Sequence, residues 1–187
     1  MRNSTGEKLV LLYTREEIAE RVRELAKAIS RDYQDKELIL VGILKGAFVF
    51  LADLIRHLTV PVTVDFIGLS SYGLGSKSSG EVVLTKDLQI PIEGRDVLVV
   101  EDILDTGLTT DLILKQLQER KLASLKLCTL IDKRERRRVP VAVDYVGFEL
   151  DKGFVVGYGI DYAEQHRHLP DIYVVNLPEE IGEEGPA

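Results

Sequence analysis

Cysteine is almost absent from this 187-residue chain, and long apolar runs are missing altogether. The single cysteine, Cys128, cannot form a disulfide within the chain. Its flanking residues Leu127 and Leu130 favour a buried thiol that packs as a small hydrophobic side chain rather than a reactive one. A chain without disulfides fits a reducing, cytoplasmic compartment. No run of about 18 apolar residues is present, so no membrane-spanning helix is expected, and the polar stretch Met1–Lys8 lacks a signal-peptide core.

Positive charge is also scarce. The 24 lysines and arginines are outnumbered by 31 aspartates and glutamates, for a formal net charge of −7. Proteins that bind nucleic acid usually present a basic surface, so we expect no nucleic-acid partner. The charge does not exclude a phosphorylated substrate, but a carboxylate-rich site would require a divalent cation to accept one.

Repeats, low-complexity stretches and interior linkers are missing too. The length is typical of one domain of about 100–200 residues. A domain of this size buries roughly 70% of its unfolded surface and requires no structural metal. We therefore predict a single domain over residues 1–187, with an N-terminal segment at 1–13 and an acidic tail at 178–187 that frays.

Helical and strand patterns alternate along the chain. Thr14 and Glu17 form a capping-box pattern that predicts the start of a helix. Nearly continuous apolar runs predict buried strands at 38–44 and 97–100. Further strands are predicted at 62–69, 82–85 and 125–131 and near Val143, Val155 and Val174, and further helices at 47–57 and 109–120. This alternation predicts an α/β fold with a mostly parallel central sheet flanked by helices, and ligands bind such sheets at the carboxyl ends of the strands.

The segment that follows the strand at 97–100 is suited to a phosphate group. Gly107 allows a tight turn and a close approach to a ligand. The next helix begins here, and its free N–H groups and positive dipole end favour an anion. Thr106, Thr109 and Thr110 add hydroxyl donors.

The other end of the same segment is acidic. Glu101 and Asp102 would repel a phosphate but suit sugar hydroxyls or a divalent cation. A ligand such as ribose 5-phosphate satisfies both ends, and an ordinary strand–loop–helix with a solvated acidic turn is the alternative. The segment is neither a Walker loop nor a dinucleotide fingerprint, because the required lysine and glycines are missing.

The stretch Val97–Thr109, VLVVEDILDTGLT, closely resembles the phosphoribosyl pyrophosphate signature of type I phosphoribosyltransferases. Four more segments resemble the hypoxanthine–guanine members of that family: VGILKG at 41–46, SSYG at 70–73, LIDK at 130–133 and FVVGYGIDY at 154–162. The resemblance implies the type I fold, with a small hood and a mobile active-site loop. It implies a purine salvage enzyme that transfers the 5-phosphoribosyl group to N9 of hypoxanthine or guanine and releases pyrophosphate. It also implies Mg²⁺ as cofactor and a homodimer or homotetramer.

The resemblance assigns the catalytic role to Asp105, which would take a proton from the purine as N9 attacks the sugar. Capping of the following helix is the structural alternative for this residue. Leu108 departs from the family pattern, because leucine offers the phosphate no side-chain contact. The phosphoribosyl group and its 5-phosphate are assigned to Glu101, Asp102, Asp105, Thr106, Gly107, Leu108 and Thr109. The metal is assigned to Glu101, Asp102 and Asp161.

The purine is assigned to Ile103, Lys133, Phe154, Val155 and Asp161. Lys133 matches the residue that contacts the 6-oxygen. An ammonium group is donor-only, so it suits hypoxanthine or guanine and opposes the amino group of adenine. Phe154 matches the aromatic residue that stacks on the base, and Val155 the residue whose backbone contacts the base edge. The arginines at 134 and 136–138 are predicted to form a solvated basic run.

Pyrophosphate is assigned to Lys45 and Gly46, in a loop that often contains a non-proline cis peptide bond, and to Arg167, whose planar fork suits two phosphate oxygens. Ser71 and Tyr72 match the mobile loop, within the Gly/Ser-rich stretch 70–80, that closes over the reaction.

Two other functions stay open at this stage. One is a regulatory RNA-binding protein on the same fold, against which the acidic charge and the presence of Asp105 and Lys133 argue. The other is a pyrimidine-specific transferase, against which Lys133 and Phe154 argue.

Overall fold

The computed structural model describes residues 8–71 and 82–176 of the chain. The elements are, in chain order, β1 (Lys8–Tyr13), α1 (Arg15–Asp32), β2 (Leu38–Leu44), α2 (Phe48–Ile55), β3 (Val62–Ser71), β4 (Val82–Lys86), β5 (Asp96–Leu104), α3 (Leu108–Gln118), β6 (Ser124–Lys133), β7 (Tyr145–Leu150), β8 (Phe154–Val156) and β9 (Ile172–Asn176). The central sheet has the strand order β4-β3-β2-β5-β6-β7, in which only the edge strand β4 runs antiparallel to its neighbour.

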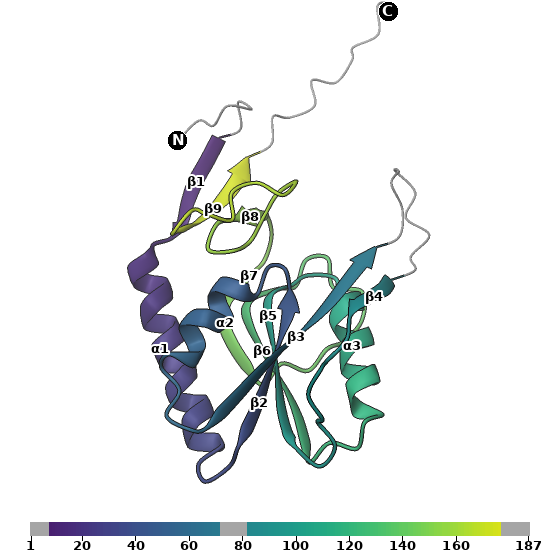
Figure 1. The fold of residues 1–187 in the computed structure, drawn as a ribbon. Helices are drawn as coiled ribbons and strands as arrows, with labels where there is room; N and C mark the ends of the chain where they lie inside the picture. Colours follow the sequence, from purple (N-terminus) through teal and green to yellow (C-terminus); the bar gives the residue numbers. More distant parts are fainter. Residues whose placement is uncertain (1–7, 72–81, 177–187) are drawn as a thin grey trace, which may run out of the picture.

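Helices cover both faces of this sheet, α1 and α2 on one side and α3 on the other (Figure 1). Successive residues of a strand point to opposite faces. Leu38 and Leu40 of β2 therefore pack in the core beneath α1 and α2, while Ile39 and Val41 pack in the core with Ile113 of α3. The predicted α/β fold with a mostly parallel, helix-flanked sheet is confirmed.

Two local predictions are also confirmed. At the start of α1, the Thr14 hydroxyl accepts a hydrogen bond from the Glu17 N–H at 3.2 Å, and the Glu17 carboxylate accepts one from the Thr14 N–H at 2.8 Å. Cys128 is fully buried in the core beneath α1 and α2. Burial raises the pKa of its thiol, so Cys128 packs as a small hydrophobic side chain.

Several strands extend beyond their predicted ends. The strand predicted at 97–100 continues to Leu104, so Glu101 and Asp102 lie within β5 rather than in the loop that follows it. Likewise, β6 continues to Lys133 instead of ending at Ile131. The extension of β5 pairs in parallel with β6, Glu101 with Thr129, Ile103 with Ile131 and Leu104 with Asp132, and these ladder bonds hold polar residues in the strands.

A separate three-stranded sheet, β1-β9-β8, forms the hood over the carboxyl ends of the parallel strands (Figure 1). Both of its pairings are antiparallel. Leu9, Val156 and Val175 form a small core of their own. Residues 8–13 are therefore a strand of the hood, whereas we predicted only an N-terminal segment at 1–13. Their partner, β9, lies at the other end of the chain, and so no local pattern indicates the pairing.

Some predictions concern residues outside the described part of the chain. From Tyr72 onward, the predicted lid at 70–80 lies outside it, and so does the predicted frayed tail at 178–187. Within residues 8–71 and 82–176, none of the helices has the length and apolar character to cross a membrane.

Candidate active site

Three segments meet where the parallel strands end beneath the hood. The connection from β2 to α2 packs its Gly46 against β5, since a Cβ on Gly46 would lie only 1.8 Å from Oδ2 of Asp102. The loop between β8 and β9 packs on the same connection. There Gly159 has a φ of 95°, and a Cβ on it would lie 2.8 Å from the carbonyl oxygen of Gly46. Gly46 meets the Asp102 carboxylate and Gly159 meets a backbone carbonyl so closely that no side chain fits at either position.

The phosphate-type loop follows β5. Gly107 has a φ of 81° and is the N-cap of α3, so the chain turns there from strand to helix. The first N–H groups of α3 thus face the loop, as an anion site requires. Leu108 is the first residue of α3, and its side chain is exposed. A cavity of about 240 Å³ lies here, lined by Ile43, Leu44, Leu69, Glu101, Ile103, Asp105, Thr106, Gly107, Thr109 and Thr110.

The acidic pair lies in the last part of β5. Glu101 is only 7% exposed, and its carboxylate accepts a hydrogen bond from the Thr110 hydroxyl at 3.2 Å. Burial and the adjacent Asp102 raise the pKa of Glu101 well above its ordinary value. Burial also raises the pKa of Asp102, against the opposing effect of a hydrogen bond with Glu101. Two buried carboxyl groups with raised pKa values favour a bound cation or sugar hydroxyls, either of which would compensate their charge.

The fit to Mg²⁺ follows from these donors. Within the described residues, no group of three or more His, Cys, Asp or Glu side chains surrounds a common point. Asp161 lies apart from the acidic pair and has Arg167 2.7 Å from its Oδ1. Magnesium commonly takes one or two carboxylates and completes its shell with water and substrate phosphates. Glu101 and Asp102 therefore fit Mg²⁺ in a complex with a phosphorylated substrate.

Asp105, Lys133 and Phe154 come together from three different elements. Lys133, the last residue of β6, is only 4% exposed, and its Nζ lies 3.9 Å from Asp105 Oδ1 and 5.3 Å from the centre of the Phe154 ring. Asp105 Oδ1 is buried, and none of the described residues donates a hydrogen bond to it. The Phe154 side chain is 45% exposed and thus open to a stacking partner, while Val155 beside it is buried.

The predicted pyrophosphate residues come from two connections, Lys45 and Gly46 from that between β2 and α2 and Arg167 from that between β8 and β9. The peptide bond between Leu44 and Lys45 is cis, as the resemblance implied. Lys45 Nζ lies 3.0 Å from Glu164 Oε2, and Arg167 lies 3.4 Å from the same oxygen. Lys45 and Arg167, both predicted to bind pyrophosphate, therefore contact the same carboxylate, that of Glu164, which the sequence analysis did not identify. The positive φ values of four non-glycine residues between 158 and 166, which turn this loop, have no simple sequence signal.

The prediction that the arginines after Lys133 form a solvated basic run was wrong for Arg137, whereas Arg136 is exposed and lies beside Asp105. Arg136 places its guanidinium 3.6 Å from Asp105 Oδ2 and 6.0 Å from the Phe154 ring centre. Arg137 turns inward, with 18% of its side chain exposed, and donates hydrogen bonds to backbone carbonyls of the phosphate loop. The only indication in the sequence that Arg136 and Arg137 lie near the site was their position shortly after Lys133. A run of charged residues is more often a solvent-exposed face, and that was the interpretation chosen.

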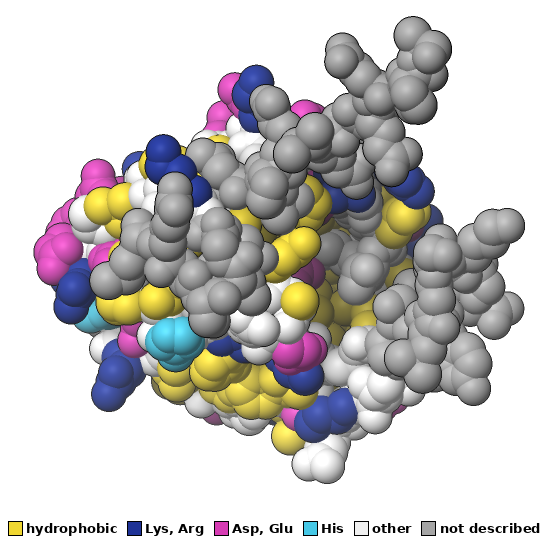
Figure 2. Space-filling view, turned by 90° about the horizontal axis from the view of Figure 1, so that it is seen from above, with side chains coloured by type: hydrophobic (Ala, Val, Ile, Leu, Met, Phe, Trp, Pro, Cys, Tyr) yellow, Lys and Arg dark blue, Asp and Glu magenta, His cyan; other side chains and the backbone are white. Residues whose placement is uncertain are grey.

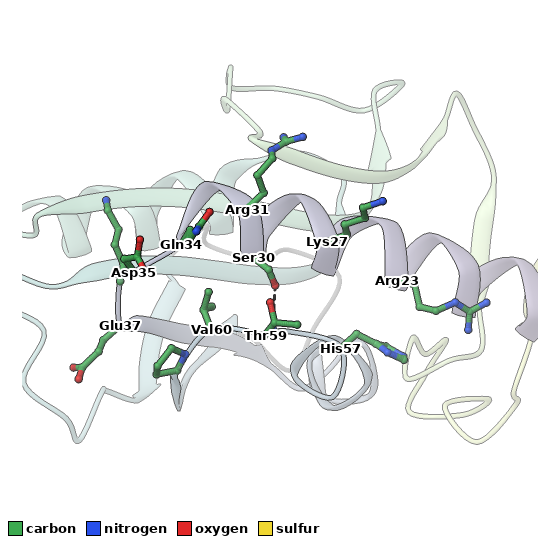
Figure 3. Close-up of a pocket in the computed structure, with 12 residues that line it drawn as sticks. Arg23, Lys27, Ser30, Arg31, Gln34, Asp35, Glu37, His57, Thr59 and Val60 are labelled. Carbon is green, nitrogen blue, oxygen red and sulfur yellow. Dashed lines mark hydrogen bonds between the residues drawn. The ribbon is translucent and has the colours of Figure 1, made fainter.

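A larger hollow of about 890 Å³ lies at the amino ends of the parallel strands, beside residues 34–37 and 57–61, which precede β2 and β3. Figure 3 shows Lys27 and Arg31 on α1 above His57, with the Thr59 N–H donating to the Ser30 hydroxyl at 3.0 Å. Arg31 complements the negative end of the α1 dipole. None of the site residues predicted from the sequence lines this hollow, and α/β sheets bind ligands at the carboxyl ends of their strands.

The surface on the hood side, seen from above in Figure 2, mixes charges of both signs with hydrophobic side chains. Lys and Arg of the described residues do not gather there into one continuous basic area. This distribution gives no support to the RNA-binding alternative, which depends on many phosphate contacts.

Comparisons with known proteins show the family to which this chain belongs. The family described as "Phosphoribosyl transferase domain" matches residues 12–163. A hypoxanthine-guanine phosphoribosyltransferase of Aquifex aeolicus is 50% identical over 176 residues, which cover 94% of this chain and 99% of that protein. One from Bacillus subtilis is 46% identical over 165 residues, covering 88% and 92%. The crystal structure of a hypoxanthine-guanine phosphoribosyltransferase from Bacillus anthracis superimposes with a TM-score of 0.84 at 45% identity, covering 91% of this chain and 99% of that one.

Proposed function

Because this chain belongs to the phosphoribosyltransferase family, we propose that it is a purine salvage enzyme that transfers the 5-phosphoribosyl group from phosphoribosyl pyrophosphate to N9 of hypoxanthine or guanine. The products are IMP or GMP and pyrophosphate. The observation that carries this proposal is the approach of Lys133 Nζ to within 3.9 Å of Asp105 Oδ1, beside the exposed ring of Phe154. A donor, an acceptor and an aromatic face in one place match the edge and the face of a 6-oxopurine.

On the purine side, Lys133 donates to the 6-oxygen, and Phe154 stacks on the ring. The Asp105 oxygen without a hydrogen-bond partner accepts the proton at N7 as N9 attacks the sugar, which is general base catalysis. Val155 contacts the base edge through its backbone. Ile103 and Asp161 complete the proposed purine set.

On the sugar side, Thr106, Gly107, Leu108 and Thr109 hold the 5-phosphate through the N–H groups and hydroxyls at the start of α3. Leu108 takes part through its backbone only, since its side chain is exposed. The pair Glu101 and Asp102 holds the ribose hydroxyls.

The proposed cofactor is Mg²⁺. Glu101 and Asp102 would hold it together with substrate oxygens, and Asp161, which lies apart from them, is proposed as a second magnesium-associated carboxylate. When bound, this ion neutralises negative charge on the departing pyrophosphate. Lys45, the N–H of Gly46 and the guanidinium of Arg167 bind and orient the same group. Ser71 and Tyr72 belong to the proposed lid, which would exclude water from the reactive sugar.

The test is a steady-state assay with hypoxanthine, guanine, xanthine, adenine and a pyrimidine base, each with phosphoribosyl pyrophosphate and Mg²⁺. We expect turnover with hypoxanthine or guanine and a kcat/KM at least about 100-fold lower with adenine, because Lys133 meets an amino group there. Absence of turnover with every purine would overturn the proposal, and turnover with the pyrimidine alone would replace it. Salt-sensitive RNA binding without turnover would favour the regulatory alternative.

The proposed partners are these substrates and further copies of the chain. Assembly into a homodimer or homotetramer is a proposal that light scattering coupled to size exclusion would test.

A further inference from the structure

The guanidinium of Arg137 joins the two segments that carry the proposed reaction groups. Its Nε donates to the carbonyl oxygen of Asp105 at 2.9 Å, and its Nη2 donates to that of Leu104, also at 2.9 Å. The same Nη2 lies 3.2 Å from the carbonyl oxygen of Lys133 and 2.5 Å from the buried carboxylate of Asp132. One side chain therefore contacts the end of β5 and the end of β6 at once.

The residues that follow extend this attachment along the loop. The N–H groups of Arg138 and Val139 both lie within hydrogen-bond distance of the Thr106 carbonyl, at 2.9 and 3.4 Å. The stem of Arg137 packs so close to Gly107 that a Cβ there would lie 3.1 Å from Arg137 Cδ. The carbonyl groups of three successive residues, 104–106, are thus held by residues 137–139.

This arrangement determines which backbone groups face the cavity. Residues 137–139 do not line the 240 Å³ cavity, whereas Asp105, Thr106 and Gly107 do. Carbonyls bound to the 137–139 segment are therefore turned away from the cavity. A phosphate is attracted by N–H groups and repelled by carbonyl oxygens, so the loop accepts an anion only while its carbonyls point elsewhere.

The chemistry of the contact requires arginine. A guanidinium has five N–H donors in a rigid planar fork, whereas a lysine ammonium has three donors at a single point. A lysine at 137 could keep the pairing with Asp132, but one ammonium cannot reach the carbonyls of residues 104, 105 and 133 together. Arg134 also binds Asp132, at 3.2 Å, and additionally pairs with Glu149 at 2.6 Å.

We propose that Arg137 is a positioning residue that holds the phosphate loop and Asp105 in register with Lys133, an inference that rests on the proposed function. Arg137 touches no substrate. It acts by orienting the backbone on which the 5-phosphate binds and from which Asp105 extends. The pyrophosphate residues Lys45 and Arg167 lie on other connections and are independent of it.

The experiment compares Arg137→Gln and Arg137→Lys with wild type, and uses Arg134→Gln as the matched control. Calorimetry measures the Kd of GMP and the Kd of pyrophosphate with Mg²⁺, and steady-state assays with the turned-over purine measure kcat. For Arg137→Gln we expect GMP binding and kcat to fall about 10- to 100-fold, because hydrogen bonds from a charged donor are lost. Pyrophosphate affinity should change less than about threefold. The GMP affinity and kcat of Arg137→Lys should lie between those of wild type and of Arg137→Gln. Arg134→Gln should keep the wild-type values of both.

The ratio of the two affinities separates positioning from general stability. A variant that is merely destabilised shows a lower Tm with an unchanged GMP-to-pyrophosphate ratio, and that result would overturn the inference. An equal loss in Arg134→Gln would also overturn it, because Arg134 touches no loop carbonyl. If Arg137→Gln does not fold, the ratio of GMP affinity to pyrophosphate affinity is measured in Arg137→Lys instead, and a ratio equal to that of wild type would overturn the inference. A wild-type protein that binds no nucleoside monophosphate would refute the proposed function itself, and the inference with it.

Discussion

Replacement of Asp105 by asparagine isolates the proposed proton acceptor from everything else in the loop. The amide has the size and shape of the carboxyl group, so the packing of the loop is kept. What changes is the ability of one oxygen to take a proton. In the structure that oxygen, Oδ1, is buried, lies 3.9 Å from Lys133 Nζ and accepts no hydrogen bond from the part of the chain that the structure describes. We expect kcat to fall by about 10²–10⁴, the usual contribution of positioned proton transfer.

The structural cost of the same substitution is small by comparison. Asp105 has two ion pairs, at 3.9 Å to Lys133 and 3.6 Å to Arg136, and its side chain is 30% exposed. Pairs of this length and exposure contribute about 0–1 kcal/mol each. The expected loss of transition-state stabilisation is about 3–5 kcal/mol, which is clearly larger. The free energy of unfolding therefore changes much less than the activation free energy.

The assay combines steady-state turnover, the Kd of the nucleotide product by calorimetry and the Tm of each variant. Asp111→Asn is the matched control, because Asp111 lies on the first turn of α3 and, among the described residues, forms an ion pair only with Lys115, at 2.7 Å. For Asp105→Asn we expect a large fall in kcat, a nucleotide Kd within about threefold of wild type and a similar Tm. A kcat within about tenfold of wild type would refute the role of Asp105 as general base.

Three further predictions concern other parts of the molecule. Lys133→Gln should lower kcat/KM for hypoxanthine by about 10²-fold and remove most discrimination against adenine, because an amide can both donate and accept; unchanged selectivity in a two-substrate competition would contradict this. Glu164→Gln should lower the KM for phosphoribosyl pyrophosphate about two- to fivefold by freeing Lys45 and Arg167, and an increased KM would show that Glu164 assists binding. Asp65→Asn should lower the free energy of unfolding at pH 7 by about 2 kcal/mol, because burial of Asp65 is outweighed by hydrogen bonds that hold its pKa at about 2, against 3.8. That contribution is present above pH 3.8 and lost as pH falls towards 2, so urea unfolding of both proteins should converge at low pH.

Much of the fold could be predicted from local sequence patterns. The capping box at Thr14 and Glu17 and the apolar strands indicated the α/β alternation, because a helix start and a buried strand depend on residues close in sequence. The turn at Gly107 was likewise predictable, since a strand, a glycine and a helix start are contiguous. Strand ends were less predictable, because Glu101 and Asp102 are held in β5 by pairing with β6 and not by their own preference.

The sequence by itself determined which chemical groups are available: a phosphate loop after β5, an acidic pair, a lysine and an aromatic residue. Only the tertiary structure decided which of them meet. The approach of Asp105 to Lys133 and the pairing of Lys45 with Glu164 join segments far apart in the chain. The inward turn of Arg137 depends on the carbonyls of Leu104 and Asp105, which the end of β5 presents to its guanidinium. Such contacts form because buried polar groups require hydrogen-bond partners. The sequence pattern does not show which distant residues the fold brings close enough to serve as those partners.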